Sequence, residues 1–319
     1  MGALVIAANV TACSSDGSED TTASAGGDAA FPVSIEHVHG TTTITEKPER
    51  IVTLGVTDAD VVLALGVAPV GNTGYTFYET GLGPWTEELV GDAELTRIDS
   101  DSEPNLEQIA GLVPDLIIGI SAGYDEAVYD KLSEIAPTVS RPDGFAAYTV
   151  DREVATETIA TALGESERGA ELNLQTADRI TATVETHPEF AGKTGVAVLP
   201  YDNQYGAFLP GDARGAFLTS LGFRIPDAIT SQDTGDSFFV GVSKENVSML
   251  DGDLILVLGD DQTTDIAADN PLVENLNAAQ NDAIIATTLD QRGAITYNSV
   301  LSIPYAIDSL VPRLSDALA

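Results

Sequence analysis

The sequence has 319 residues, of which 43% are hydrophobic and 20% charged, a composition typical of a globular protein long enough for two domains. Its 50 aspartates and glutamates outnumber its 14 lysines and arginines, which gives a net charge of −36. A surface this acidic would repel nucleic acid and anionic lipid headgroups, so neither is expected as a direct partner. The only cysteine is Cys13, which excludes an intramolecular disulfide and a cysteine-rich metal site.

The first 13 residues are almost wholly apolar or small, and they are too few to span a bilayer. We interpret residues 1–13 as a signal segment that ends at Cys13. It lacks the basic residues that open such segments, which is expected if the true start codon lies upstream. Residues 10–13, Val-Thr-Ala-Cys, resemble the lipoprotein box of bacteria. The resemblance implies that Cys13 is lipidated and anchors the protein to the outer face of the cell membrane.

Residues 14–30 are rich in Ser, Asp, Gly, Ala and Thr and contain no large apolar side chain. A segment of this composition cannot bury a core, so we predict a flexible acidic linker. Its length corresponds to a reach of roughly 20–25 Å, which would hold the next domain clear of a membrane.

Residues 31–150 are predicted to form an N-terminal lobe in which strands and helices alternate. Strands are expected at residues 33–39, 42–44, 50–54, 69–71, 116–120 and from 138 onward, and helices at 60–65, 106–112 and 125–135. The run Arg-Ile-Val-Thr-Leu at 50–54 is typical of a buried strand, and Gly66 is the expected end of the first helix.

Residues 151–192 are predicted to be a helical connector. Residues 165–186 should form one helix of about six turns, ended by His187 and Pro188. Apolar positions are sparse in this helix, which suits a helix that bridges two lobes rather than one buried in either.

Residues 193–319 are predicted to form a C-terminal lobe, with strands at 194–199 and 283–285 and a closing helix at about 299–318. The expected fold class is therefore α/β, with two Rossmann-like lobes of mainly parallel sheets, a long α-helix joining them and a ligand cleft between them. In such sheets, ligands meet the loops beyond the carboxyl ends of the strands. Those loops are residues 72–79, 121–125, 141–145, 201–214, 259–263 and 291–298.

Two segments, residues 105–118 and 243–256, repeat one pattern at domain-sized spacing and support the two-lobed interpretation. Each copy has a helix N-cap, a glutamate two residues later and an aspartate that opens a buried strand: Asn105, Glu107 and Asp115, then Ser243, Glu245 and Asp253. The helix dipole alone would favour a glutamate at this position. It explains less well why the glutamate is present in both copies of a repeat that has otherwise diverged.

Gly-Ile-Ser-Ala-Gly at residues 119–123 matches the nucleophile elbow of serine hydrolases and follows a predicted strand, as that motif requires. A hydrolase that uses Ser121 would need a later histidine. The only downstream one, His187, lies at the predicted end of the connector helix. A tight turn also needs small residues, so we expect no enzyme and keep a serine hydrolase as the alternative of a different class.

His37 and His39 share one face of a predicted strand and could begin a metal site. Neither carboxylates nor cysteine cluster near them, so a surface strand is the preferred interpretation and no metal site is expected. No phosphate-binding Gly-x-x-x-x-Gly-Lys motif is present, and no Gly-x-Gly-x-x-Gly follows the first strand of either lobe.

The chain resembles the periplasmic-binding-protein family of iron-siderophore uptake, whose members are solute receptors of ABC transporters with a helical lobe connector. The matching segments are residues 47–52, 60–66, 103–107, 114–117, 121–124, 215–223 and 297–302. The resemblance covers about residues 31–319, and the order and spacing of these segments carry it. It implies a rigid connector, small closure on binding and delivery of the ligand to a membrane permease.

The resemblance also assigns roles to particular residues. One glutamate of each lobe meets arginines on the permease dimer, and by position these are Glu107 and Glu245. In hydroxamate-binding members, the tyrosines at the positions of Tyr124 and Tyr297 line the ligand site. Those members also have an arginine two residues before the 103–107 segment, where this chain has Asp101, and this departure speaks against a plain hydroxamate ligand.

Ligand chemistry adds further candidates. A ferric chelate is bulky and coordinatively saturated, so its receptor needs aromatic walls and a few cationic donors rather than metal ligands. Arg214 is the predicted anion donor, and Trp85 and Tyr201 are the further aromatic candidates. We therefore predict a monomeric, lipid-anchored receptor without a cofactor that binds a ferric siderophore, with haem or a corrinoid as the alternative ligand.

Overall fold

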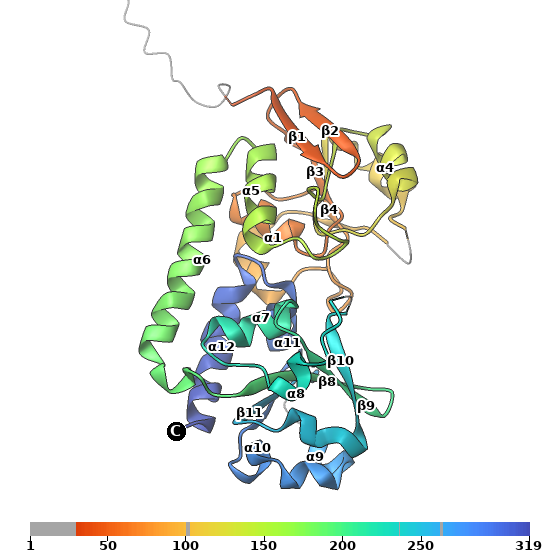
Figure 1. Ribbon diagram of the computed structural model, residues 1–319. Coiled ribbons are helices and arrows are strands. Elements are labelled where there is room, and N and C mark those ends of the chain that lie inside the picture. The colour runs from red at the N-terminus through yellow and green to blue at the C-terminus, as the bar shows by residue number, and fades with distance from the viewer. Residues whose placement is uncertain (1–29, 100–102, 236, 262–263) are drawn as a thin grey trace, which may run out of the picture.

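The computed structural model describes residues 30–99, 103–235, 237–261 and 264–319, so the predictions for Cys13 and residues 14–29 lie outside the described residues. Two α/β lobes stand one above the other, and a long helix runs beside both (Figure 1). Within the described part of the chain, no helix is long and apolar enough to cross a membrane.

The N-terminal lobe is built on a five-stranded sheet of order β5-β4-β3-β6-β7, in which every pair of neighbours is parallel. Its strands are β3 (Ile51–Thr53), β4 (Gly71–Asn72), β5 (Thr96–Arg97), β6 (Leu116–Gly119) and β7 (Thr138–Ser140). A separate antiparallel hairpin precedes it, formed by β1 (Val33–His37) and β2 (Gly40–Ile44). The parallel sheet was predicted, although β5 was not, because two residues carry no readable strand pattern.

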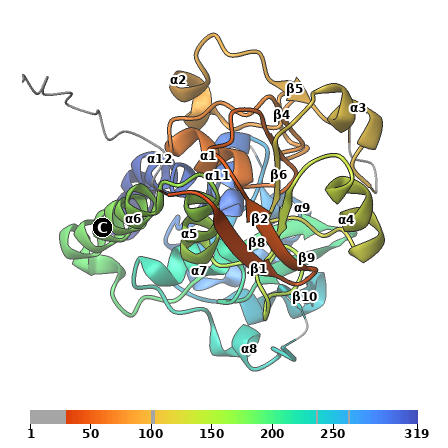
Figure 2. The same ribbon diagram turned by 90° about the horizontal axis from the view of Figure 1, so that it is seen from above.

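Helices cover both faces of this sheet. They are α1 (Asp58–Ala64), η1 (Pro84–Thr86), α2 (Glu87–Val90), α3 (Leu106–Gly111), α4 (Glu126–Ser133) and α5 (Arg152–Ala162). Successive strand residues point to opposite faces, so Ile51 packs with α1 and α5 whereas Val52 packs with α3 and α4. Seen from above, α5 and α3 lie on opposite sides of the strands (Figure 2).

The C-terminal lobe has a mixed sheet of order β10-β9-β8-β11-β12. Its strands are β8 (Gly195–Tyr201), β9 (Gln204–Phe208), β10 (Phe239–Ser243), β11 (Leu254–Val257) and β12 (Ile284–Ala286). The three strands β8, β11 and β12 are parallel as predicted, but β9 and β10 are antiparallel additions.

The antiparallel strands overturn the prediction of a loop over residues 201–214. Asp202 and Asn203 form a two-residue turn between the paired residues Tyr201 and Gln204, and both turn residues have positive φ, 42° and 62°. Aspartate and asparagine tolerate this conformation and are favoured in tight hairpin turns. The Asp-Asn pair was therefore a readable hairpin signal that the sequence reasoning missed.

The helices of the C-terminal lobe again pack on both faces. They are α7 (Ala213–Ser220), α8 (Asp227–Thr230), η3 (Lys244–Leu250), α9 (Ile266–Asp269), η4 (Pro271–Asn275), α10 (Asn277–Gln280), α11 (Leu289–Tyr297) and α12 (Ser302–Ala317). One core contains α7, α11 and α12, and the other contains η3, α9 and α10.

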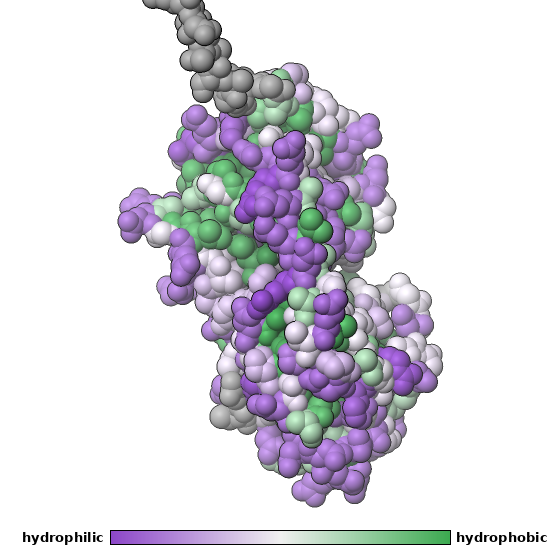
Figure 3. All heavy atoms as spheres, turned by 90° about the vertical axis from the view of Figure 1, so that its left-hand side faces the viewer, coloured by the Kyte–Doolittle hydropathy of each residue, from purple (hydrophilic) through white to green (hydrophobic). Residues whose placement is uncertain are grey.

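The connecting helix is α6 (Ser166–Thr186), whose 21 residues match the prediction closely; the short η2 (Pro188–Phe190) follows it. It approaches α5 where a β-carbon on Gly169 would lie 2.4 Å from that of Ala160, so this crossing requires a glycine. At its other end, Arg179 forms an ion pair with Asp308 of α12. The side of the molecule that carries α6 is largely hydrophilic (Figure 3).

The predicted sequence repeat is also a structural repeat. Asp115 accepts hydrogen bonds from the backbone N–H groups of Glu49 and Arg50 at 2.8 and 2.9 Å, which ties the start of β6 to the start of β3. Asp253 accepts one from Thr194 N–H at 2.8 Å and ties β11 to β8 in the same way.

The helix caps of the two copies differ. Asn105 caps α3 as predicted, accepting a hydrogen bond from Gln108 N–H. The predicted Ser243 cap is wrong, because its side chain makes no cap bond and the second copy forms the 3₁₀ helix η3 rather than an α-helix.

Candidate ligand-binding site

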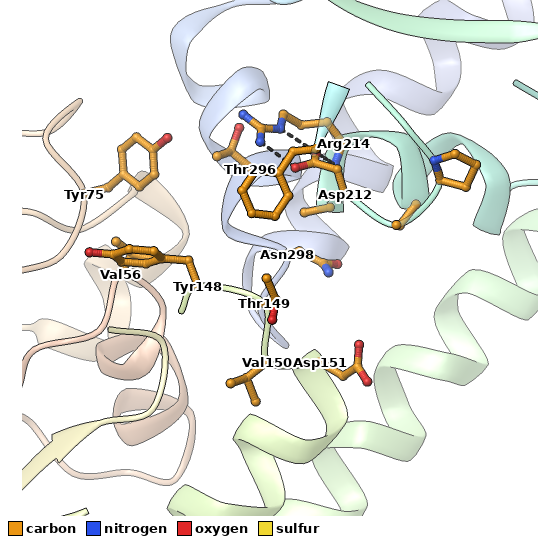
Figure 4. A pocket seen from close by; sticks show the side chains of 15 residues that line it. Val56, Tyr75, Tyr148, Thr149, Val150, Asp151, Asp212, Arg214, Thr296 and Asn298 are labelled. Carbon is orange, nitrogen blue, oxygen red and sulfur yellow. Dashed lines mark hydrogen bonds and ion pairs between the residues drawn. The ribbon is translucent and has the colours of Figure 1, made fainter. Parts of the chain in front are cut away.

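A cavity of about 490 Å³ lies at the predicted cleft and is lined by both lobes (Figure 4). We call it the main cavity. Its lining residues are Val56, Tyr75, Tyr148, Thr149, Val150, Asp151, Pro210, Gly211, Asp212, Ala213, Arg214, Ala216, Phe238, Thr296 and Asn298. Val56 and Tyr75 follow β3 and β4, so the N-terminal wall lies beyond the carboxyl ends of parallel strands, as predicted.

Three aromatic side chains form walls of the main cavity. Tyr148 is 63% exposed and Phe238 is 47% exposed, so both rings leave much of their surface open for contact with a ligand in the cavity that they line. Tyr75 is steadied by Phe77 and Tyr297, whose ring centroids lie 4.3 and 5.1 Å away. The sequence did not single out these three residues. Their role depends on how exposed each side chain is and on the direction in which it points, and neither can be read from sequence.

Tyr148 is held in a conformation that few residues other than glycine adopt. Its φ is 64°, and its ring lies so close to Gly123 that a β-carbon there would sit 2.5 Å from the ring. Such backbone strain persists where the surroundings fix it and is concentrated at functional sites. The loop before α5 therefore presents the Tyr148 ring to the cavity at a defined place.

Arg214, the predicted anion donor, lines the main cavity, but it is not a free cation. Its Nε and Nη2 donate to the two carboxylate oxygens of Asp212 at 2.7 and 2.6 Å, and the guanidinium lies 3.9 Å above the ring of Phe208. The backbone N–H of Arg214 also donates to Asp212, which caps α7. Asp212 thus fixes the direction of the arginine and offsets its charge.

A second hollow of about 90 Å³, the inner recess, adjoins the main cavity. Its residues include Thr57, Ser121, Arg152, Asn298 and Ser299. Arg152 donates to Asn298 Oδ1 at 3.1 Å, a bond between the start of α5 and the C-terminal lobe, and it also forms an ion pair with Glu153.

A buried carboxylate organises the N-terminal wall of the recess. Asp58 accepts hydrogen bonds from the N–H groups of Gly55, Ile120 and Ser121 at 2.9–3.0 Å, which holds the turns after β3 and β6 together. Position 55 must be glycine, because a β-carbon there would lie 2.2 Å from the Asp58 carboxylate. Burial raises the pKa of Asp58 to about 6, and these hydrogen bonds oppose the rise.

The aromatic residues predicted from the sequence lie elsewhere. Tyr297 is buried and lines only the recess, with its hydroxyl donating to Gly81 C=O at 3.0 Å. Tyr124 bonds Ser140 at 2.9 Å inside the N-terminal lobe, and Tyr201 packs on Phe239, so neither lines the main cavity or the recess. Burial raises the pKa of Tyr297 and of Tyr124, so both remain neutral phenols.

Trp85 belongs to a polar contact between the lobes. Its Nε1 donates to Asp60 Oδ2 at 2.7 Å, and the hydroxyl of Ser299 donates to the same oxygen at 2.5 Å. Asp60 is almost completely buried, and burial raises its pKa to about 7 against the effect of these two bonds. Trp85 also packs against the core of the C-terminal lobe, so this cluster holds the two lobes together.

The predicted docking glutamates, Glu107 and Glu245, are both exposed. Each lies in the first turn of its helix, α3 or η3, on the outside of a different lobe. The structure therefore leaves both carboxylates accessible to a partner.

Ser121 has no histidine beside it. Its hydroxyl hydrogen-bonds Thr57 at 2.7 Å, while His37 bonds Thr42 and His187 bonds Glu189. Nε2 of His39 has no hydrogen-bond partner, and its ring stacks on Tyr129. Among the described residues, no three His, Cys, Asp or Glu side chains are grouped to hold a metal ion.

Comparison with known proteins identifies a family and several relatives that share this fold. The family described as "Periplasmic binding protein" matches residues 51–290. The Fe(3+)-citrate-binding protein YfmC of Bacillus subtilis is 29% identical over 255 residues, 78% of this chain and 76% of that protein.

Two solved structures are similar over nearly their whole length. A periplasmic solute binding protein of Mycobacterium smegmatis matches with a TM-score of 0.79 and 30% identity, covering 90% of this chain and 99% of that one. PiaA of Streptococcus pneumoniae in complex with ferrichrome matches with a TM-score of 0.75 and 29% identity, covering 90% and 98%.

Proposed function

The chain belongs to the periplasmic binding protein family, and from this premise we propose that it is the extracytoplasmic receptor of an ABC importer that captures a ferric siderophore between its lobes. The observation that carries the proposal is the main cavity, with the exposed rings of Tyr148 and Phe238 turned into a volume of about 490 Å³ between two lobes. A saturated iron chelate needs such walls and no protein ligand to the metal. The relatives are named as binding proteins, and the receptor role requires no catalysis by Ser121.

Titration of the purified protein tests the ligand class. Ferric citrate, ferrichrome, haem and cobalamin are added in turn while the fluorescence of Trp85 is followed, since it is the single tryptophan. We expect saturable quenching by a ferric siderophore. Saturable binding of haem or cobalamin alone would reassign the ligand, and no binding by any of them would refute the receptor proposal.

Two tyrosine variants separate the cavity found in the structure from the residues suggested by sequence. Tyr148→Ala removes an exposed wall, so we expect affinity for the bound chelate to fall by about tenfold, the range of one lost aromatic contact. Tyr201→Ala should leave affinity within a factor of about two, because its ring packs on Phe239 outside the cavity. The reverse order of effects would place the ligand elsewhere.

Delivery to the permease is proposed to use Glu107 and Glu245. Both are exposed, one on each lobe, as a two-point contact with a dimeric permease would require. Glu107→Lys combined with Glu245→Lys should abolish iron uptake by cells and leave chelate affinity unchanged. Glu126→Lys is the matched control, since it reverses another exposed first-turn glutamate, on α4, and should preserve uptake.

Attachment to the membrane is proposed to occur through lipid on Cys13. The supporting observation is the Val-Thr-Ala-Cys sequence followed by a polar segment without large apolar residues. Cys13→Ser should move the protein from the membrane fraction to the medium or periplasm, whereas retention on the membrane would contradict the anchor.

The receptor is proposed to act as a monomer, which light scattering of residues 30–319 tests.

A further inference from the structure

The charge on the walls of the main cavity is negative. One arginine, Arg214, and two aspartates, Asp151 and Asp212, line it, which gives −1 with all three ionised. The two oxygens of Asp212 occupy Nε and Nη2 of Arg214, so that pair presents little net charge to a ligand. Asp151 is exposed at the N-cap position of α5 and adds a carboxylate to the lining.

The inner recess does not supply the missing positive charge. Its arginine, Arg152, has a side chain that is only 12% exposed, and it is paired with Glu153. Each arginine that lines the main cavity or the recess is thus matched by a neighbouring carboxylate. Beyond the cleft, the net charge of −36 creates a negative field that is strongest at low salt.

The groups that remain available are neutral. The donors that the walls offer are the Tyr75 and Tyr148 phenols and the amide nitrogen of Asn298 (Figure 4). The hydroxyls of Thr149 and Thr296 already donate to the backbone carbonyls of Ala146 and Arg292, so they can only accept. Burial raises the pKa of Tyr75, so it stays protonated and can donate. Neutral donors beside aromatic faces suit an uncharged, partly apolar ligand with carbonyl oxygens.

We propose that this cleft selects ferric chelates without net negative charge, of the trihydroxamate class, and rejects anionic tricatecholate and citrate chelates. Three hydroxamate anions cancel the charge of ferric ion, whereas three catecholate dianions leave the complex strongly anionic. The relatives do not decide this question, since one is named for ferric citrate and another was solved with ferrichrome. The inference rests on the proposed function, and it assigns Asp212 and Asp151 as specificity-determining residues.

The test measures affinity by Trp85 quenching for ferrichrome, cationic ferrioxamine B, ferric enterobactin and ferric citrate. We expect the first two to bind at least about tenfold more tightly than the anionic pair. Salt provides a signature that does not depend on ligand shape. Affinity for an anion that the cleft repels should rise as salt increases, and affinity for neutral ferrichrome should stay constant.

Asp212→Asn is the decisive variant. Asparagine also caps helices, so α7 is retained while the charge that offsets Arg214 is removed. The ratio of the affinity for ferric enterobactin to the affinity for ferrichrome should rise on the order of tenfold at low salt. Asp151→Asn should raise this ratio too, and Asp130→Asn, on the exposed side of α4, should leave it unchanged.

The outcomes separate the two proposals. If the wild-type protein binds the anionic chelates more tightly than ferrichrome, with an affinity that falls as salt increases, the charge selection is wrong and the receptor function stands. The selection would also be overturned if the ratio of the affinity for ferric enterobactin to the affinity for ferrichrome were the same in wild type and in Asp212→Asn. If no chelate of any charge binds, the receptor function itself fails.

Discussion

The buried carboxylate of Asp60 should make the stability of the protein depend on pH. Its pKa is raised from 3.8 to about 7 in the folded state, so the folded protein holds a proton that the unfolded chain releases. A raised carboxyl pKa contributes stability that is fully present below the unfolded value and lost as pH rises through the folded value. The shift of roughly three units corresponds to about 4 kcal/mol in total, of which roughly 2.5 kcal/mol falls between about pH 5 and pH 8.

Asp60→Asn removes this titration while keeping an oxygen that can accept from Trp85 and Ser299. Urea unfolding at several pH values, followed by Trp85 fluorescence and by circular dichroism, gives the free energy of unfolding for both proteins. The wild-type free energy should fall relative to the variant by roughly 2.5 kcal/mol from about pH 5 to pH 8. Asp130→Asn is the control, because its exposed side chain should give a curve parallel to wild type. Parallel curves for Asp60→Asn would show that the carboxylate is already charged in the folded protein and would refute the reasoning.

Three further predictions concern the fold. Asp115→Ala and Asp253→Ala should each lower the free energy of unfolding by about 1–2 kcal/mol, since both remove bonds to backbone N–H groups; urea denaturation checks this. Asn203→Gly should leave stability unchanged or raise it by up to about 1 kcal/mol in a thermal scan, because this position has positive φ, and a clear loss would contradict the assigned turn. Gly169→Val should destabilise by about 1–3 kcal/mol by forcing α5 and α6 apart, whereas Gly111→Ala, with open space around it, should not.

The fold was largely readable because its signals are local. Buried parallel strands such as 116–119 are continuous apolar runs, and the connector helix has an uninterrupted pattern with clear ends. Asp115 and Asp253 occupy the same position in the two copies of the sequence repeat. The structure explains why, since each aspartate ties two neighbouring strands together. By contrast, the 3₁₀ form of the second repeat helix depends on its packing, which no local pattern reports.

The ligand site was harder to predict, because a tyrosine in a loop can face a cavity, a core or the partner lobe. Tyr124 and Tyr297 face the interior and Tyr148 faces the cavity, although the first two were predicted to lie in loops at the cleft. The predicted loop over residues 291–298 is wrong, because Tyr297 is the last residue of α11. Arg214 lines the main cavity, but its pairing with Asp212 was not predicted, because it follows from the geometry at the start of α7. Sequence therefore located the cleft better than it described the cleft's charge.

The hairpin at residues 201–204 shows how one missed turn misassigns a site. Tyr201 and Arg214 belong to a segment predicted as a single loop, which would place both at the ligand. Because Asp202 and Asn203 reverse the chain, residues 204–208 return through the sheet as β9, and the chain reaches the cleft only afterwards, at Pro210. Tyr201 is left at the turn end of the hairpin, whereas Phe238, just before β10, is brought beside the end of β9 through the pairing of Phe239 with Phe208. The C-terminal wall of the cavity is thus built by the open end of an antiparallel strand pair, and an aromatic residue there, Phe238, lines the cavity, whereas Tyr201 beyond β8 does not.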